Sequence, residues 1–428
     1  MPLTLEISQL YIKVNGSAPN DELQKDLKEV VIDRSLHLPS MFTIQLYAAH
    51  GKMTWAESSS LKLGAKIEIM GGRGAISSLL VGKIASIEPE LYHDNPTIVI
   101  RGYALSHKLY RGRHTRTYLD VMDSDIVQQI AGQHGLTPST DATSVKYDQV
   151  IQNNQTDAEF LLQRARRIGY ELWVDDNTLY FRKPPASSGA AAQLKWGENL
   201  GDFRARLSAS EQVNEVGVYG WDMTKKEAIA ETVSSGSGAP SIGESQTGSA
   251  LGQSSWGSAK YKVAEYGVFT TAEATKRAQA QFDEFTSSFV EAEGTCDGNN
   301  DIAPGKRVQV SGVGTRFSGT YYVTKVVHVY NREAGLVTHF TASGRRDRDV
   351  WSLMHDAQSQ PKQTGLVPAL VSNNDDPQKW GRVKVKYPWL VTDTGQPVES
   401  DWARLVSPMA GKDRGLFIVP EVDDEVLV

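Results

Sequence analysis

The chain has almost no cysteine, no excess of basic charge and no long hydrophobic segment. Its 428 residues include one cysteine, Cys296, which excludes an internal disulfide and a cysteine-ligated zinc site. Lysine and arginine total 45 against 51 aspartate and glutamate, so the basic surface typical of nucleic-acid binding is missing. No apolar run reaches the ~20 residues of a membrane helix, and residues 1–6 lack the features of a secretory signal peptide. We therefore expect a protein made and folded in the cytosol.

The sequence contains one pattern twice, at a separation of roughly 240 residues. Each copy consists of three short segments in which apolar and polar residues alternate, separated by glycine or polar turns. This is typical of antiparallel strands. The segments are 64–69, 82–87 and 97–102 in the first copy, and 304–310, 319–326 and 336–341 in the second. A duplicated β module without an evident chemical motif indicates a chain built around symmetry and not around a pocket.

The first half of the chain divides into two expected parts. Alternating segments throughout residues 1–110 predict a first β-barrel. Residues 111–183 are expected to form a small α/β insert, because the apolar period becomes helical at 121–134. A second helix is predicted to open with a capping box formed by Thr156 and Glu159, and a hairpin closes this part.

The second half divides in the same way. Residues 184–350 are expected to form a second barrel, with a long exposed Gly/Ser-rich loop at 234–257 and a helix at 271–293. Residues 351–428 carry short strands with Gly and Pro turns, which favour a five-stranded OB-type barrel. The predicted fold class is thus mainly β, with two homologous barrels, a small α/β insert and a C-terminal OB-fold barrel. The last strand is still running at Val428, and we expect the natural protein to continue beyond it.

Several motifs that carry chemistry in other proteins have simpler structural interpretations here. The stretch 71–74 resembles a phosphate-binding loop, but it lacks the required lysine spacing, and a hairpin turn is favoured. His328 and His339 lie on predicted strands and show no third ligand, so packed histidines are favoured over a metal site. Acidic clusters at 375–376 and 423–425 fit turns and strand starts better than a cation site.

The other candidates are equally open to structural interpretations. Cys296 has no histidine nearby in sequence, so an inert thiol is expected. For an aromatic stripe on the third helix, packing on its own barrel is favoured over binding of a partner; the stripe comprises Phe282, Phe285 and Phe289. The charged run 345–348 lines a channel, contacts a neighbouring subunit or forms a solvated linker. A catalytic carboxylate pair is not excluded, but no catalytic, cofactor-binding or metal-binding residue is assigned.

Two sets of motifs resemble those of contractile-tail proteins. One set resembles the OB domain of contractile-tail spike proteins and comprises 380–385, 387–389, 402–405 and 415–428. The other resembles the phage late-control protein D and tail-hub family and comprises 304–308, 317–323, His328 and 338–340. Together the two sets resemble VgrG-type hub–spike fusions, and the resemblance covers essentially the whole chain.

The resemblance implies a structural protein. In this family two homologous barrels per chain, in a homotrimer, form a pseudo-hexameric ring that matches a hexameric inner tube. The trimer is implied to cap the tube and to pierce the target envelope, with baseplate proteins and a spike-tip protein or effector cargo as further partners. The OB domain is implied to lead into a β-helix needle beyond residue 428. No enzymatic activity, cofactor or nucleic acid is implied. The protein is expected to be made in the bacterial cytoplasm and to become part of a contractile particle.

The kind of contractile system is the least determined point. Residues 35–43 resemble the hubs of phage-like extracellular injection systems more than those of type VI secretion. A type VI secretion VgrG spike and a contractile phage tail hub remain alternatives. Two rivals belong to other classes: a cell-wall hydrolase that uses the barrels as a platform, which requires a fused hydrolase domain, and a free carbohydrate-binding β protein, which predicts a monomer.

Overall fold

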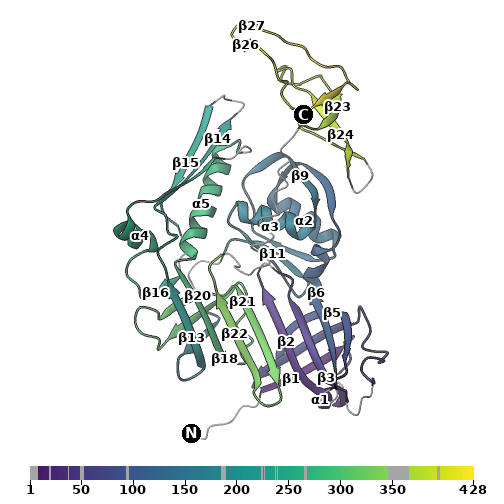
Figure 1. Cartoon of the computed structure of the whole chain (residues 1–428), viewed down its shortest axis with the longest axis vertical. Helices are drawn as coiled ribbons and strands as arrows, with labels where there is room; N and C mark the ends of the chain where they lie inside the picture. The colour runs from purple at the N-terminus through teal and green to yellow at the C-terminus, as the bar shows by residue number, and fades with distance from the viewer. Residues whose placement is uncertain are drawn as a thin grey trace. The chain divides into compact units, whose positions relative to one another are not determined.

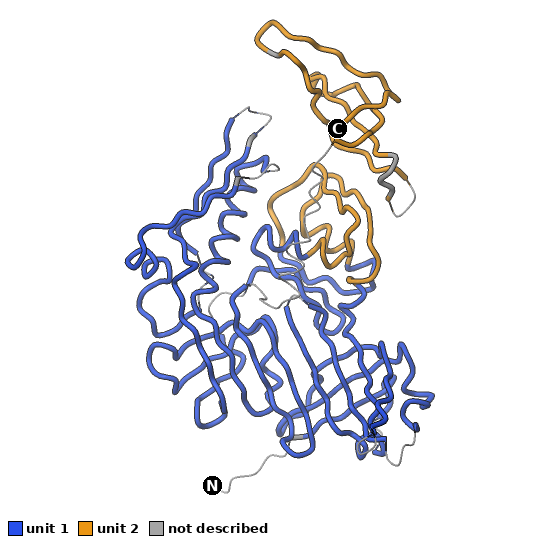
Figure 2. The backbone as a smooth tube through the Cα atoms, viewed as in Figure 1, with its two compact units in different colours: residues 1–108, 131–141, 162–349 blue, residues 109–130, 142–161, 350–428 orange. Residues whose placement is uncertain are grey.

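The protein is described from a computed structural model of the chain (Figure 1). The structure describes residues 8–345 and 366–428, apart from short gaps at 19–20, 37, 49–52, 93–95, 185–188, 223–224, 226, 237, 239, 265–267 and 393–395. These residues form two compact units (Figure 2). The first comprises 1–108, 131–141 and 162–349, and the second comprises 109–130, 142–161 and 350–428. Within the described residues, no helix is long and apolar enough to cross a membrane.

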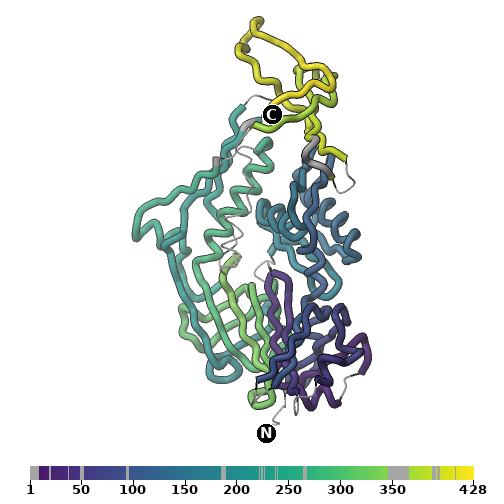
Figure 3. Tube along the Cα trace, turned by 45° about the vertical axis from the view of Figure 1, so that its right-hand side comes forward, coloured from purple at the N-terminus to yellow at the C-terminus, as the bar shows by residue number. Residues whose placement is uncertain are grey.

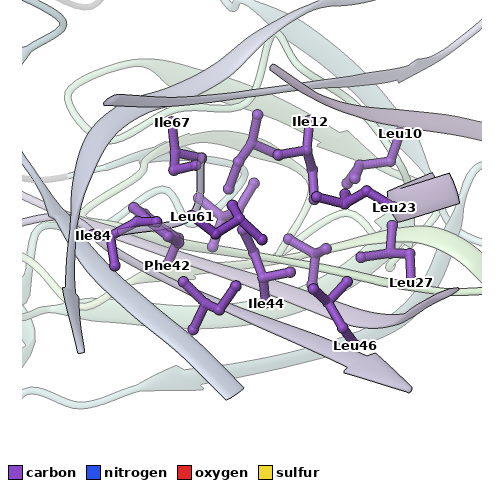
Figure 4. Packing of buried hydrophobic residues seen from close by; sticks show 14 of the residues in the cluster. Leu10, Ile12, Leu23, Leu27, Phe42, Ile44, Leu46, Leu61, Ile67 and Ile84 are labelled. Carbon is purple, nitrogen blue, oxygen red and sulfur yellow. The ribbon is translucent and has the colours of Figure 1, made fainter. Parts of the chain in front are cut away.

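The first β module, residues 8–104 of the first unit, contains antiparallel strands and one short helix. Alternation determines which side chains are buried: Phe42, Ile44 and Leu46 on one strand point into the core, while the residues between them are only half-buried. Figure 4 shows these three side chains packing against Ile12 and Ile67 from other strands. The elements are β1 (Ser8–Val14), α1 (Asp21–Asp26), β2 (Leu27–Ser35), β3 (Met41–Tyr47), β4 (Lys66–Arg73), β5 (Ser77–Glu90) and β6 (Thr97–Ala104).

The second β module, residues 192–342, also belongs to the first unit and has its own core. Tyr321, Val308 and Phe340 are among the buried side chains that fill it. The strands are β12 (Ala192–Lys195), β13 (Leu200–Leu207), β16 (Ser241–Ile242), β18 (Val290–Asp297), β19 (Arg307–Ser311), β20 (Gly319–Tyr322), β21 (Lys325–Asn331) and β22 (Gly335–Ala342).

The two modules share one ten-stranded sheet. Its order is β1-β4-β5-β6-β3-β2-β21-β22-β18-β13, so the six strands of the first module continue directly into four of the second. The junction is the antiparallel pair β2–β21, which runs from Glu29 opposite Asn331 to Ser35 opposite Lys325. The purple strands of the first module and the green strands of the second lie side by side at this junction in Figure 1 and Figure 3. The duplication read from the sequence therefore produces two modules joined edge to edge.

A long excursion between β13 and β18 forms a smaller layer in the same unit. It holds a three-stranded sheet covered by a helix, and its core contains Val216, Val218, Ile229, Ala278 and Phe282. The elements are β14 (Glu215–Asp222), β15 (Glu227–Val233), α4 (Gly248–Trp256), β17 (Lys260–Ala264) and α5 (Thr271–Ser287).

Two sequence-based expectations for this excursion need correction. The long loop expected at 234–257 contains the short strand β16 and the helix α4, which is capped by the Thr247 hydroxyl accepting from the Ala250 amide at 3.2 Å. The glycine content reflects close packing, since a Cβ at Gly248 would come within 2.6 Å of the Phe289 ring. The helix expected at 271–293 ends at Ser287, because the alternating sequence from Val290 onward continues as β18.

Residues 105–182 connect the two β modules. The strand pair β7–β9 falls in the second unit, whereas the sheet β10-β11-β8 falls in the first. The predicted capping box is present at the start of α3: the Thr156 hydroxyl accepts from the Glu159 amide at 3.1 Å, and the Glu159 carboxylate accepts from the Thr156 amide at 3.0 Å. The elements are η2 (Leu105–Tyr110), β7 (His114–Met122), α2 (Asp123–Gln133), β8 (Thr137–Thr140), β9 (Lys146–Gln155), α3 (Asp157–Arg167), β10 (Glu171–Asp175) and β11 (Thr178–Arg182).

The C-terminal part of the second unit is made of short strands. Four of them form a sheet in the order β25-β24-β23-β28, and two more form a hairpin. Its small core comprises Ala369, Val371, Val383 and Val385. The strands are β23 (Pro368–Asn373), β24 (Lys384–Val391), β25 (Pro397–Glu399), β26 (Ala410–Gly411), β27 (Arg414–Gly415) and β28 (Glu425–Leu427).

Candidate functional site

The feature with the clearest functional meaning is the junction between the two β modules. Along β2, Val30 and Ile32 are fully buried, and His328 lies opposite Ile32 on β21 with 0% of its surface exposed. On the other face of the same pair, the Lys325 ammonium lies 3.1 Å from the Asp33 carboxylate. The junction thus has a buried inner face, which contains Val30, Ile32 and His328, and a more exposed outer face that carries this ion pair, as in a sheet that is covered on one side.

Side-chain contacts away from the β2–β21 strand pair also join the two modules. The Arg73 guanidinium forms an ion pair with Asp297, and the Asn300 amide donates to the Gly71 carbonyl. At the edge of the first module, Arg34 donates to Asp175 on β10 at 2.8 Å. The two modules and the β10–β11 hairpin are therefore held together by charge-assisted hydrogen bonds as well as by backbone pairing.

The structure places the two histidines in separate environments. His328 and His339 lie on adjacent strands but on opposite faces of the sheet. His328 lies opposite Thr338, and the next residue along that strand, His339, points to the other face. The His328 Nδ1 lies 3.0 Å from the Thr338 hydroxyl, and the His339 Nδ1 lies 3.0 Å from that of Thr295. Burial lowers the pKa of His328 to about 3, so this imidazole is neutral at physiological pH. Across the described part of the chain, no group of three or more His, Cys, Asp or Glu side chains is placed to hold a metal ion.

A buried carboxyl group lies at the start of β10. Glu171 is buried and accepts a hydrogen bond from the Tyr322 hydroxyl on β20. Burial raises the pKa of Glu171 to about 7, although Tyr322 and the guanidinium groups of Arg345, Arg182 and Arg307 oppose that rise. The Arg307 guanidinium lies over the Tyr322 ring, 5.7 Å from its centre. This cluster ties the β10–β11 hairpin to the second β module.

The glycine-rich stretch at 71–74 is a strand end followed by a turn, as the structural interpretation predicted. Gly71, Gly72 and Arg73 belong to β4, and Gly74 has a φ of 82° in the turn toward β5. A Cβ on Gly72 would lie 2.0 Å from the Ala75 carbonyl oxygen, so this position requires glycine. The stretch forms the tip of a hairpin, with no helix following it.

The acidic clusters of the C-terminal part organise loops. Asp376 is buried and accepts hydrogen bonds from the Arg382 guanidinium at 2.8 and 3.1 Å and from the amides of Gln378 and Trp380. The Arg382 guanidinium holds the pKa of Asp376 well below its usual range. In the second cluster, Asp424 accepts from the Glu421 amide at 2.8 Å.

The remaining candidates separate into different environments. Cys296 is buried on β18, and burial raises the pKa of its thiol to about 12, as expected for an inert cysteine. The aromatic stripe does not form one face: Phe282 fills the core under α5, whereas Phe289 packs in the core of the second β module. Arg345 lies 3.5 Å from Asp283, and the rest of the charged run, 346–348, lies outside the described residues.

Comparison with known proteins identifies the family. Residues 5–331 match the family described as the Alg8 N-terminal domain. The chain belongs to the Alg8 N-terminal domain family. Residues 367–428 match a second family, the type VI secretion system and phage-baseplate injector OB domain. The OB domain expected at the C-terminal end is thereby confirmed. No curated protein sequence matches the chain.

Solved structures with a similar fold are phage tail and type VI secretion proteins. A 43 kDa prophage tail protein from Shewanella oneidensis is 14% identical and gives a TM-score of 0.60. The match covers 78% of this chain and 97% of the tail protein. An Escherichia coli component of the type VI secretion system, itself described as similar to bacteriophage T4 tail proteins, is 14% identical and covers 88% of both chains, with a TM-score of 0.56. The Francisella PdpA–VgrG complex is 10% identical, covers 98% of this chain and 76% of the other, and gives a TM-score of 0.54.

These findings confirm the resemblance to hub–spike proteins and the predicted fold class. The fold is mainly β, with a duplicated module and a C-terminal OB domain, and it is the fold of phage tail and VgrG proteins. The residues that the sequence did not single out are those of β13, the terminal strand of the sheet, and residues 86–90 of β5, which lie beyond its pairing with β4. Their alternation of charged and apolar side chains was visible, but nothing local showed that these strands lie at an edge.

Proposed function

We propose that the protein is the central hub and spike base of a contractile injection system. Three copies form a ring at the tip of the hexameric inner tube, and the OB domains continue this assembly toward the target. The observation that supports this most directly is the shared sheet, in which two equivalent modules of one chain are joined edge to edge through β2 and β21. Three chains with two modules each present six equivalent units, which matches the symmetry of a six-fold tube.

The function so proposed is mechanical and needs no chemical step. The hub caps the tube, supports assembly of the tube and baseplate, and is driven through the target envelope when the sheath contracts. Its partners are further copies of itself, the tube protein, baseplate proteins and a spike-tip protein or cargo. The protein is made in the bacterial cytoplasm and functions within the assembled particle. The opening motif at 35–43 favours a phage-like extracellular system over type VI secretion.

Native mass spectrometry of the purified chain tests this proposal. A species of three times the 47.0 kDa chain mass is expected, and electron microscopy of that species should show a ring with six similar lobes. A monomer that persists at high concentration would refute the hub assignment, because a single chain offers only two of the six units. A dimer or tetramer would refute it as well.

A further inference from the structure

The strand pairs β2–β3 and β13–β18 of the two β modules share one irregularity. β2 pairs with β3 through a bulge between Leu27 and Glu29, and β13 pairs with β18 through a bulge between Leu200 and Asp202. A bulge adds one residue at a defined position and is a specific feature of a strand pair. β13 therefore has the place in the second module that β2 has in the first.

The strand β21, which pairs with β2, also has a counterpart in the first module. An equal number of residue pairs from each bulge leads to Arg101 on β6 in the first module and to Thr341 on β22 in the second, so these two residues correspond. Arg101 pairs with Ser86 of β5, and Thr341 pairs with Lys325 of β21. The end of β5, residues 86–90, therefore corresponds to the part of β21 that β2 covers.

Among the described strands, these two counterparts have free edges. Beyond its bulge near Ile84, β5 pairs with β6 alone, whereas β21 pairs with β22 on one side and with β2 on the other. β13 is the terminal strand of the ten-stranded sheet and pairs with β18 alone, apart from a local bridge between Trp196 and Leu200. The described strands thus present one complementary pair of edges, and six strands separate β5 from β13 in the sheet.

We propose that β13 of one copy pairs antiparallel with residues 86–91 of a second copy, repeating between chains the β2–β21 junction. The proposal rests on the trimer of the proposed function and specifies the surface that holds it together. In the observed junction Arg34 lies opposite Val326. Leu207 corresponds to Arg34 and Ile87 corresponds to Val326, so the same register between chains places Leu207 opposite Ile87.

The transferred register brings together complementary side chains on both faces. On the outer face, Arg206 lies opposite Glu88 and Arg204 lies opposite Glu90, and both arginines are exposed in the single chain. Opposite charges at directly facing positions stabilise a strand pair. A shift of the register by one residue would set the arginines against apolar side chains instead. The register follows from the positions of the bulges alone, so the facing charges are independent support for it.

The inner face is apolar in the same register. Phe203, Ala205 and Leu207 of β13 pack on the core of the second β module. In the proposed pairing they face Leu91, Pro89 and Ile87, and Leu91 is 59% exposed in the single chain. The pairing would extend the apolar layer from one chain into the next and cover this leucine.

Other charges and Pro89 shape this edge. Glu88 is bonded within its own chain to Arg101 at 3.2 Å, and Arg206 lies 3.8 Å from Glu291, so the two ion pairs join an existing charged surface. Pro89 has no amide hydrogen to contribute, and a proline at a strand edge weakens backbone pairing with any strand, β13 included. Side-chain complementarity is therefore the main source of selectivity at this edge.

A head-to-tail contact of this kind forms a closed ring when the rotation that relates one chain to the next adds up to a full turn. The junction within the chain and the proposed junction between chains relate equivalent modules, so each step turns by a similar angle. Three chains then complete a ring of six modules with alternating internal and external junctions.

Disulfide cross-linking of the full chain tests the pairing and its register. Arg204→Cys combined with Glu90→Cys places two thiols at directly facing positions, where Cβ atoms are about 5 Å apart. Cys296 is buried and does not compete. After oxidation, non-reducing gels should show species up to three chains, all reversed by reductant. The matched control, Arg204→Cys with Ser86→Cys, offsets one thiol by four residues, about 13 Å along the strand, and should not cross-link.

Exchanging the charges of Arg204 and Glu90 gives a second test, which is read from the concentration at which the trimer forms. Arg204→Glu should raise the concentration needed for trimer formation roughly tenfold, and adding Glu90→Arg should restore it. The rescue is the decisive part, because Arg204 also faces Glu293 of its own chain.

The outcomes separate this inference from the proposed function. A trimer that neither cross-links at 204–90 nor recovers with the exchanged charges would overturn the strand pairing and leave the hub assignment intact. A wild-type chain that stays monomeric would overturn both. Cross-linking of the control pair as readily as the test pair would overturn the register.

Discussion

Replacing Glu171 by glutamine should change how the stability of the first unit depends on pH. The wild-type carboxyl group is buried beside Tyr322, and burial raises its pKa from 4.5 to about 7. A carboxyl group with a raised pKa in the folded state binds a proton more tightly there than in the unfolded chain. Its contribution to stability is therefore complete below pH 4.5 and is lost as the pH rises through 7. Glutamine has no proton to lose and should remove this dependence.

The size of the effect follows from the pKa shift. A difference of one pKa unit corresponds to about 1.4 kcal/mol, so the shift of Glu171 corresponds to about 3 kcal/mol between its two limits. From pH 4.5 to pH 8.5, the free energy of unfolding of the glutamine variant should gain that amount relative to wild type. Other groups that titrate in this range contribute equally to both proteins and cancel in the difference.

Urea unfolding followed by tryptophan fluorescence, at several pH values, measures this difference. Glu333→Gln is a suitable control, because Glu333 is exposed at the tip of the β21–β22 hairpin and its replacement should leave the wild-type pH dependence unchanged. A constant difference between Glu171→Gln and wild type across the whole range would refute the assignment of a buried, protonated carboxyl group at this position.

Two further predictions concern side chains whose environments are well defined. Asp376→Asn should speed hydrogen exchange at the amides of Gln378 and Trp380, because the carboxylate that accepts from both amides and from Arg382 loses its charge; Asp375→Asn, at an exposed position, should not, and equal exchange in both variants would contradict this role. Cys296 should resist iodoacetamide at pH 8 in the folded protein and gain one adduct in urea, since burial raises its pKa to about 12; rapid alkylation without urea would contradict the described burial.

The sequence predicted local structure well because the signals for it are local. Alternation along residues 97–102 and 336–341 marked β6 and β22, and the Thr156–Glu159 spacing marked the start of α3. The stripe of three phenylalanines was misleading for a physical reason. Phe289 follows Phe282 and Phe285 at helical spacing, but the helix has already ended, and the side chain belongs to another core.

Long-range pairing had no comparable signal in the sequence. β2 and β21 are both apolar alternating strands, and nothing in either sequence names the other as its partner. Glu171 illustrates the same limit, because an isolated glutamate at a strand start gives no sign that Tyr322 and three arginines will surround it. The division into parts at 110, 183 and 350 remains a prediction.

The excursion between β13 and β18 bears on how this protein can be modified. In the first β module the corresponding strands, β2 and β3, are joined by a few residues after Ser35, while in the second module residues 208–289 occupy the same connection. The strand pair keeps its register and its bulge in both cases. The fold has thus already accepted a complete subdomain at this point without altering the sheet. The connection between β2 and β3 is accordingly the natural place to graft a foreign domain, such as a fluorescent reporter or a binding module, onto this protein.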